Sequence, residues 1–234
     1  MAGLKTVIVI VAYNAEKTLE KTYRDIPAGI GDLVCVDDAS KDGTVRIARE
    51  LNLALLVRPK NQGYGASQKT GYREALKRGA EIVVLLHADY QYDPRKIPEL
   101  IDPILRERAE VVLGSRIMGR GALRGGMPFW KYCANRLSTA LANAVFGMRL
   151  TDYHSGFRAY HGRALRALGF EGYSDNYIFD AQMIAGAVSK KMRIAEIPIA
   201  TRYFKEASSI TFWPCVRYGL GMLGILFRYL CVKE

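Results

Sequence analysis

Residues 81–94 read EIVVLLHADYQYDP, an apolar run that ends in a cluster of polar side chains just before a proline. A short uninterrupted apolar run is typical of a buried strand, and a proline can begin the helix that follows. The cluster contains a histidine, two aspartates and a glutamine. An exposed loop is one interpretation of these residues, and a site for a metal or a charged ligand is the other.

Similar apolar runs alternate with segments of helical spacing along the first half of the chain. We predict strands at 6–13, 32–38, 53–59, 81–89 and 109–116, and helices at 15–26, 40–52, 64–79 and 94–108. Strands that alternate with helices indicate βαβ units and a mostly parallel sheet. Their uninterrupted apolar character indicates a sheet covered by helices on both faces. The fold class is therefore α/β, with a Rossmann-like central sheet.

Polar residues follow four of the predicted strands at their carboxyl ends. Ligands of open α/β sheets bind beyond this edge. The residues are Ala12, Tyr13 and Asn14 after the first strand, Asp37 and Asp38 after the second, His87 to Gln91 after the fourth, and Ser115 and Arg116 after the fifth. Because they converge on one edge, the sequence favours a binding site over a solvent loop.

The composition limits the class of protein. A chain of 234 residues, half of them hydrophobic, is long enough for one large α/β domain or two small ones. The four cysteines have no CxxC spacing, so we expect neither a thiolate metal site nor a disulfide framework, and a reducing cytosol fits better. The net charge of +11 favours phosphorylated or anionic partners, with a generally basic proteome as the alternative.

Six motifs in this order resemble the family 2 glycosyltransferases of GT-A fold, and especially the polyprenyl-phosphate (dolichol-phosphate-mannose-synthase-like) sugar transferases. They are VIVAYN (9–14), VDDASKDGT (36–44), NQGYGAS (61–67), HADYQYDP (87–94), VVLGSR (111–116) and DYHSGFRAY (152–160). The resemblance covers about residues 5–210 and implies a GT-A domain at 1–210 that uses a nucleotide-diphospho-sugar, such as a UDP- or GDP-sugar.

The resemblance also implies a donor site. The family's Val-Asp-Asp segment binds the base and ribose, and its Asp-x-Asp-x-Gln segment reaches the nucleotide and a divalent metal. This chain keeps the second acid and the glutamine but has a histidine in place of the first acid. The implied donor-binding residues are Ala12, Tyr13, Asn14, Asp37, Asp38, His87, Ala88, Asp89 and Arg202. For Arg202, contact with the diphosphate and a structural ion pair are both open.

The departure of a diphosphate calls for a hard cation such as Mg²⁺ or Mn²⁺, which prefers oxygen ligands and needs few from the protein when phosphates supply the rest. Asp89 and Gln91 are two residues apart on an extended segment, so their side chains point the same way. We predict both as metal ligands. His87 has the spacing to join them, whereas Asp93 is better placed to cap the next helix.

On the acceptor side, the resemblance implies that Arg116 and Lys131 hold an acceptor phosphate and that Ser155 and Arg158 lie near it. The implied catalytic residues are Asp89, Arg116 and Asp152. A lipid phosphate is already anionic near neutral pH and needs no general base, whereas a hydroxyl acceptor needs one within hydrogen-bond reach. The candidate bases are Asp152, Asp175 and Asp180.

The C-terminal segment 211–234 contains ten uninterrupted apolar residues between Arg217 and Arg228, about half the length of a membrane span. We expect an interfacial helix that carries Phe212, Trp213 and Phe227, with a core or homodimer helix as the alternative.

These features together predict an inverting, metal-dependent glycosyltransferase that acts on a polyprenyl phosphate, peripheral on the cytoplasmic face of the membrane. The alternatives are transfer to a hydroxyl group, and a nucleotide-binding module without catalysis. A nucleic-acid partner is not expected, because the acidic cluster would repel its phosphates.

Overall fold

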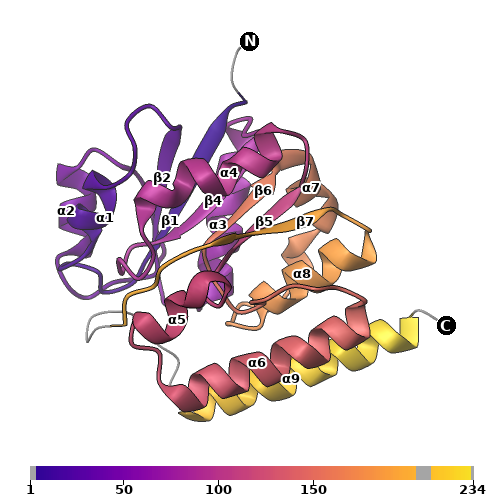
Figure 1. The fold of residues 1–234 in the computed structure, drawn as a ribbon. Coiled ribbons are helices and arrows are strands. Elements are labelled where there is room, and N and C mark those ends of the chain that lie inside the picture. The colour runs from indigo at the N-terminus through magenta and orange to yellow at the C-terminus, as the bar shows by residue number, and fades with distance from the viewer. Residues whose placement is uncertain (1–3, 204–211, 233–234) are drawn as a thin grey trace.

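The computed structural model describes residues 4–203 and 212–232, and they form an α/β fold around a seven-stranded sheet of order β3-β2-β1-β4-β6-β5-β7 (Figure 1). The strands are β1 (Thr6–Ala12), β2 (Asp32–Asp37), β3 (Ala54–Val57), β4 (Ile82–His87), β5 (Val111–Ser115), β6 (Arg158–His161) and β7 (Ile194–Pro198). The helices are α1 (Leu19–Arg24), α2 (Thr44–Glu50), α3 (Tyr64–Lys77), α4 (Ile97–Leu105), α5 (Gly121–Arg124), α6 (Phe129–Phe146), α7 (Gly162–Leu168), α8 (Phe179–Ser189) and α9 (Phe212–Val232).

The five strands expected in the first half are confirmed, and so is the mostly parallel sheet. The structure adds β6, which lies antiparallel between β4 and β5 and pairs Arg158 with both Leu85 and Leu113. This strand was not predicted, because a four-residue strand that contains an arginine lacks the apolar run of the others.

One helix begins later than predicted, since the sequence indicated a helix from Ser40. Helix α2 starts at Thr44, and Gly43 precedes it without a side-chain cap. Ser40 instead accepts a hydrogen bond from the backbone N–H of Asn14 at 2.8 Å, and Thr44 Oγ1 accepts one from Ala15 at 2.7 Å. The serine therefore ties the loop after β2 to the loop after β1, and both loops lie at the carboxyl edge of the sheet. The cap predicted for Asp93 is confirmed, since its side chain accepts from the N–H of Arg95.

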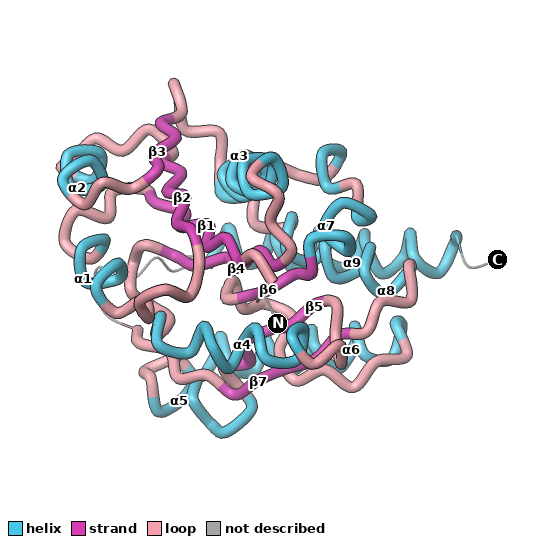
Figure 2. The backbone as a smooth tube through the Cα atoms, turned by 90° about the horizontal axis from the view of Figure 1, so that it is seen from above, coloured by secondary structure: helices cyan, strands magenta, loops and turns pink. Residues whose placement is uncertain are grey.

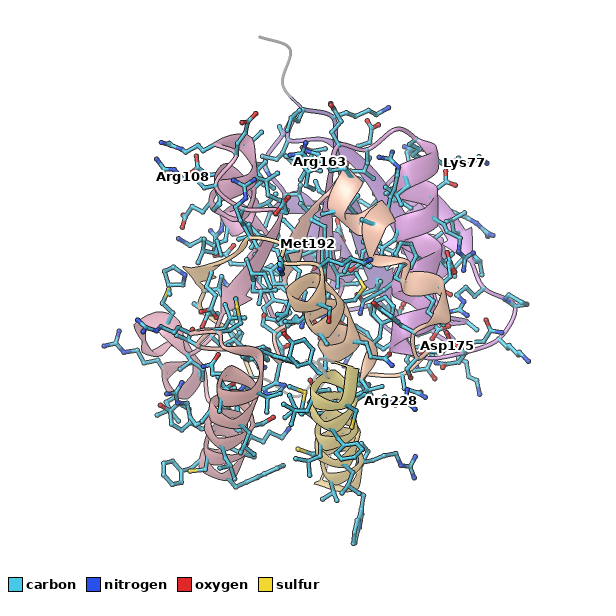
Figure 3. All side chains as sticks on the ribbon, turned by 90° about the vertical axis from the view of Figure 1, so that its right-hand side faces the viewer. Lys77, Arg108, Arg163, Asp175, Met192 and Arg228 are labelled. Carbon is cyan, nitrogen blue, oxygen red and sulfur yellow. The ribbon has the colours of Figure 1, made fainter. Side chains whose placement is uncertain are left out.

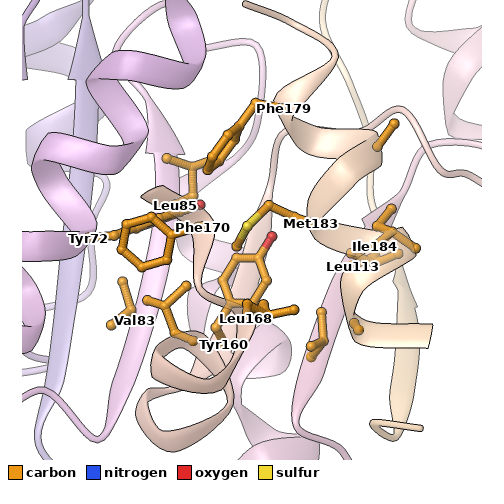
Figure 4. Packing of buried hydrophobic residues seen from close by; sticks show 14 of the residues in the cluster. Tyr72, Val83, Leu85, Leu113, Tyr160, Leu168, Phe170, Phe179, Met183 and Ile184 are labelled. Atoms are coloured by element: carbon orange, nitrogen blue, oxygen red, sulfur yellow. The ribbon is translucent and has the colours of Figure 1, made fainter. Parts of the chain in front are cut away.

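Alternate residues of the strands fill two cores, as their period of two requires. Val7, Val9 and Val11 of β1 face the core under α3, α7 and α8, and Ile8 and Ile10 face the core under α1, α2 and α4. Figure 2 shows these helices on opposite sides of the sheet. Figure 4 shows the first core, where Tyr72 of α3 and Phe179 and Met183 of α8 pack over Val83 and Leu85 of β4. Each such side chain stabilises the fold by about 1.5–3 kcal/mol through burial, so the strand ends are firmly held.

Helices α6 and α9 lie side by side and run in the same direction beyond the carboxyl edge of the sheet (Figures 1 and 3). Phe146 of α6 and Tyr229 of α9 meet edge to face, with ring centroids 4.8 Å apart. We call this pair the α6/α9 layer. In the described ranges, 4–203 and 212–232, no helix is both long and apolar enough to cross a membrane.

Large hydrophobic side chains are exposed along both helices of the α6/α9 layer. They are Phe129, Trp130, Leu137 and Leu141 of α6 and Trp213, Val216, Leu220, Leu223, Phe227 and Leu230 of α9. We call this set the outer apolar face. Phe212, which was also expected there, has a side chain outside the described part of the chain.

Candidate active site

A cavity of about 570 Å³ lies between the carboxyl edge of the sheet and the α6/α9 layer. Its volume is in the range of small-molecule sites. The predicted site residues that line it are Ala12, Tyr13, Asp38, His87, Ala88, Asp89, Gln91, Arg116 and Lys131. The structure thus brings residues from five separate segments to one cavity. Asn14, Asp37, Asp152, Ser155, Arg158 and Arg202 are not among its lining residues.

The two consecutive aspartates after β2 have different surroundings. Asp38 lines the cavity and accepts hydrogen bonds from the backbone N–H groups of Gln62 and Gly63, at 3.2 and 3.1 Å, beside Arg58 at 3.3 Å. Asp37 is fully buried, and its Oδ2 accepts from the N–H of Ser40 at 2.9 Å. Asp38 therefore fixes the loop before α3 against the cavity wall, while Asp37 fixes the loop that leaves β2.

Of the two residues that follow β1, Tyr13 lines the cavity and Asn14 does not. Asn14 has a left-handed backbone (φ 50°), and its Oδ1 accepts from the N–H of Lys41 at 2.9 Å. It joins the loops after β1 and β2 without lining the cavity. Tyr13 is 50% exposed at the cavity wall, so its ring is available to stack on a ligand.

The turn after β4 carries the predicted metal ligands. Asp89 is 9% exposed, its Oδ1 accepts from the N–H of Gln91 at 3.0 Å, and both residues line the cavity. Between them, Tyr90 adopts a left-handed backbone (φ 57°), which costs a non-glycine residue about 1–2 kcal/mol.

This turn is held from outside the cavity by contacts on the Tyr90 ring. Lys21 Nζ and Arg202 Cζ each lie 4.4 Å from the ring centroid, and the Tyr90 hydroxyl donates to Asp25. Each cation–π contact contributes about 0.5–1 kcal/mol, enough together to offset the backbone strain. Arg202 also lies 3.6 Å from Asp93. Of the two interpretations of Arg202, the structure shows the ion pair and gives the residue a supporting position behind the turn.

Arg116 and Asp152 form a buried bidentate ion pair. Arg116 Nε donates to Asp152 Oδ2 at 2.7 Å and Nη2 donates to Oδ1 at 2.9 Å, while Asn135 Nδ2 and the N–H of His154 also reach Oδ1, each at 3.0 Å. Burial alone would raise the pKa of Asp152, but the Arg116 guanidinium and these donors hold it well below its usual value. Burial would likewise lower the pKa of Arg116, and Asp152 raises it instead. Both groups are therefore charged, and Asp152 is poorly suited to accept a proton.

Lys131 lies on the cavity wall of α6 and supplies a second cation. Burial lowers its pKa, and the nearby charge of Arg116 acts in the same direction. Asn135 and Ser138 follow it at helical spacing and line the same cavity. Neither residue was predicted, although the i, i+4, i+7 spacing places both on the same helix face as Lys131.

Ser155 and Arg158 take structural positions. The fully buried guanidinium of Arg158 donates to the carbonyls of Ser155, Tyr153 and Asp180, at 2.7, 3.0 and 2.8 Å. Its donors are thereby used inside the fold, so the expected contact of Arg158 with an acceptor has no geometric support. The hydroxyl of Ser155 accepts from the N–H of Phe157 within the same loop.

His87 and His154 are cavity-lining imidazoles with lowered pKa values. Burial lowers the pKa of His87, although Asp89 and Asp180 partly oppose this. Burial lowers the pKa of His154 to about 4, and its Nδ1 lies 2.8 Å from the Tyr218 hydroxyl of α9. Both rings are neutral near pH 7. The contact between His154 and Tyr218 was not predicted, because the two residues are 64 positions apart in the sequence.

Known proteins resemble this chain in sequence. Residues 7–169 match the family model described as Glycosyl transferase family 2. A UDP-N-acetylglucosamine–dolichyl-phosphate N-acetylglucosaminyltransferase from Methanococcus voltae is 30% identical over 221 residues, 87% of this chain and 88% of the relative. An undecaprenyl-phosphate mannosyltransferase from Micrococcus luteus is 30% identical over 207 residues, 84% of this chain and 83% of the relative.

Solved structures agree on the fold. Glucosyl-3-phosphoglycerate synthase from Mycobacterium tuberculosis, crystallised with Mn²⁺, UDP and glucosyl-3-phosphoglycerate, superposes with a TM-score of 0.73 over 97% of this chain and 80% of that chain, at 20% identity. This confirms the predicted GT-A fold. With six ordered motifs at the cavity and a family match over most of its length, the chain belongs to glycosyl transferase family 2.

Proposed function

We propose that this glycosyltransferase moves a sugar from a nucleotide-diphospho-sugar, such as a UDP- or GDP-sugar, to a polyprenyl phosphate at the cytoplasmic face of a membrane. The observation that carries the proposal is that one cavity is lined by two kinds of residue. Asp89 and Gln91 are the candidate metal ligands, and Arg116 and Lys131 are the candidate phosphate-binding cations. The relatives named for dolichyl-phosphate and undecaprenyl-phosphate transfer support the choice of acceptor.

The side chains of Asp89 and Gln91 fit a divalent ion that is also coordinated by the sugar nucleotide. Asp89 and Gln91 offer oxygens from one turn, and His87 lines the same cavity. Among residues 4–203 and 212–232, no group of three or more His, Cys, Asp or Glu is placed to hold a metal. An ion here would therefore share its coordination with the diphosphate oxygens of the donor. When bound, Mg²⁺ or Mn²⁺ would neutralise the charge that develops on the leaving diphosphate.

The surroundings of the candidate bases favour an acceptor that is already ionised. Asp152 is engaged by Arg116, Asn135 and a backbone N–H. Asp180 accepts from Tyr64 and Gln68, and Asp175 is paired with Lys69 at 3.0 Å. A phosphate acceptor needs none of them, because its oxygen is anionic and Arg116 and Lys131 can hold it. Direct attack of that oxygen on the anomeric carbon would invert its configuration.

The outer apolar face supports peripheral attachment. Trp213 and Phe227 are 76% and 69% exposed, and Arg217 and Arg228 of the same helix are also exposed. An amphipathic helix with exposed aromatic and cationic residues binds the membrane interface. Residues of the same layer also line the cavity, so a headgroup at the interface would be about one helix thickness, 10–12 Å, from Lys131. A homodimer through this face is the alternative occupant.

The test combines the purified protein with radiolabelled UDP- or GDP-sugars and vesicles that contain undecaprenyl phosphate. We expect a lipid-linked sugar product that requires Mn²⁺ or Mg²⁺, disappears with EDTA, and shows the inverted anomeric configuration by NMR. Transfer only to a water-soluble hydroxyl acceptor would favour the hydroxyl alternative. Nucleotide binding without any transfer or hydrolysis would favour the non-catalytic module.

A further inference from the structure

A partly buried chain of hydrogen bonds connects His87, at the position where the family motif has an acid, to Asp180 of α8. His87 Nε2 lies 2.8 Å from the Tyr64 hydroxyl, and that hydroxyl lies 3.0 Å from Asp180 Oδ2. Tyr64 is the first residue of α3, so three separate elements meet at this chain. The sequence separations, 23 and 116 residues, hide the arrangement from any motif.

The far end of the chain is fixed as an acceptor. Asp180 Oδ2 lies 3.7 Å from the buried guanidinium of Arg158, and Asp180 Oδ1 accepts from Gln68 Nε2 at 3.0 Å. The amide of Gln68 is itself oriented, because its Oε1 accepts from the Tyr72 hydroxyl at 2.7 Å. An ionised carboxylate can only accept hydrogen bonds, so the bond between Tyr64 and Asp180 must use the phenolic proton.

The direction of this bond sets the tautomer of His87. Tyr64 has one proton, and a hydrogen bond to a carboxylate is roughly twice as strong as one to a neutral acceptor. With that proton directed at Asp180, the Tyr64 oxygen can only accept from His87, so we assign the ring hydrogen to Nε2. If Tyr64 donated its proton to His87 Nε2 instead, the oxygens of Tyr64 and Asp180 would face each other without a proton between them. This would cost about 1–3 kcal/mol.

The other ring nitrogen, Nδ1, then carries a lone pair, on a residue two positions before Asp89. His87 lines the cavity, and its Nδ1 has no hydrogen-bond partner in the part of the chain that the structure describes. Packing holds the ring in place: a Cβ on Gly156 would come within 2.5 Å of His87 Cε1 and Nε2, and Tyr92 packs edge to face at 5.3 Å. Only a glycine at position 156 allows the ring to sit here.

We propose that Tyr64 and Asp180 are positioning residues that hold His87 as its Nε2–H tautomer, so that Nδ1 serves as a nitrogen ligand to the divalent ion at Asp89 and Gln91. The ligand half of this inference rests on the proposed function, because it requires a metal in the cavity. A nitrogen ligand favours Mn²⁺ over Mg²⁺, which demands oxygen. This chain thus replaces the family's first acid with a base whose proton is kept away from the cavity.

The tautomer is tested in the metal-free protein by long-range ¹H–¹⁵N NMR of ¹⁵N-histidine samples, in which the chain has only three histidines to assign. We expect protonated Nε2 and bare Nδ1 for His87. Tyr64→Phe should give a mixture of His87 tautomers, because Nε2–H loses its acceptor. The ring of residue 64 keeps its stacking contact with Tyr177, which has a centroid distance of 5.3 Å. Asp180→Asn should also remove the single tautomer. The matched control is Tyr92→Phe, since the Tyr92 hydroxyl accepts from the Gly156 N–H and not from His87.

The metal contact is tested by pulsed EPR of the protein with Mn²⁺ and UDP. We expect an imidazole nitrogen coupling that is lost in His87→Gln, and a Mn²⁺ affinity about 10–100-fold weaker in Tyr64→Phe, the usual cost of losing an outer-shell partner. A protonated Nδ1 in the unaltered protein, or the same single tautomer in Tyr64→Phe, overturns the positioning role whether or not the enzyme transfers sugar. Bound Mn²⁺ without the nitrogen coupling overturns the ligand role. Failure of Mn²⁺ to bind refutes the metal in the proposed function and the ligand role with it, while the NMR result still decides the positioning role.

Discussion

Asp152→Asn is the substitution that best separates a positioning role for this carboxylate from a role as general base. The side chain is fully buried, and its oxygens accept from Arg116, Asn135 and the N–H of His154. An asparagine has the same shape but offers an NH₂ group in place of one oxygen. Whichever oxygen is replaced, the new N–H groups face existing N–H donors, and Arg116 loses its counter-charge.

Removing one partner of a buried ion pair costs about 3–5 kcal/mol, since the remaining charge stays buried without compensation. We therefore expect Asp152→Asn to lower the free energy of unfolding by this amount, with a melting temperature lower by about 2–4 °C for each kcal/mol. The matched control is Asp102→Asn, whose carboxylate also lies 2.7 Å from an arginine, Arg106, but on the exposed surface. Exposed pairs contribute only about 0–1 kcal/mol, so the control should be nearly unchanged.

The assay is urea unfolding of both variants, repeated from neutral to acidic pH. The pKa of Asp152 is lower in the folded protein than in the unfolded chain, so its contribution is complete above the unfolded value of about 3.9 and is lost as the pH falls below it. The difference between the native protein and Asp152→Asn should therefore shrink below about pH 4. Equal losses for the two variants would refute the buried pair. A normal stability with no turnover would instead support a role as base.

Four further outcomes follow from the site. Asp89→Ala should abolish Mn²⁺-dependent nucleotide binding without changing the melting temperature, and unchanged affinity in Mn²⁺ titrations would contradict this. Lys131→Ala should raise the KM for lipid phosphate by about tenfold or more, the loss of a charge-assisted bond of about 1.5–3 kcal/mol, whereas Lys131→Arg should not. Trp213→Ser combined with Phe227→Ser should weaken vesicle binding but leave donor hydrolysis intact, and normal flotation with vesicles would exclude the membrane role of this face. His87→Asp restores the family acid and should shift the metal preference from Mn²⁺ toward Mg²⁺, measured as the ratio of the two activation constants.

The sequence predicted β1 to β5 because each is an apolar run between turn signals, and hydrophobic burial alone determines such strands. It did not predict β6, in which Arg158 occupies the centre of the sheet. A buried guanidinium is acceptable there only because three carbonyls from the loop and α8 receive its donors. That compensation is a tertiary property, and no local pattern encodes it.

The candidate site was predictable where neighbours on one strand end determine it. Asp89 and Gln91 share the cavity as predicted, but through a turn at the left-handed Tyr90 and not on the extended segment that the prediction assumed. Asp37 and Asp38 are consecutive at the end of a strand, so their side chains point in opposite directions, and only Asp38 lines the cavity. The part of the cavity wall that α6 and α9 form could not be predicted from the sequence. A helical apolar pattern shows which face of a helix is buried but not which element covers that face. The polyprenyl-phosphate motifs located Arg116, but only the structure showed Asp152 holding it.

The α6/α9 layer connects the two halves of the proposed function, since its helices have the cavity on one side and the outer apolar face on the other. Lys131 is on the cavity side of α6, and Leu137 of the same helix is 65% exposed on the other. A helix with its side chains is about 10–12 Å thick, so a phosphate at the membrane interface must pass roughly one helix thickness to meet Lys131 and Arg116. Where α6 and α9 border the cavity, the small side chains of Ala134 and Ser138 and the bare backbone of Gly219 line it. Bulkier residues there would narrow the route for an isoprenoid chain, and the cations inside would then be separated from the lipid that carries their phosphate.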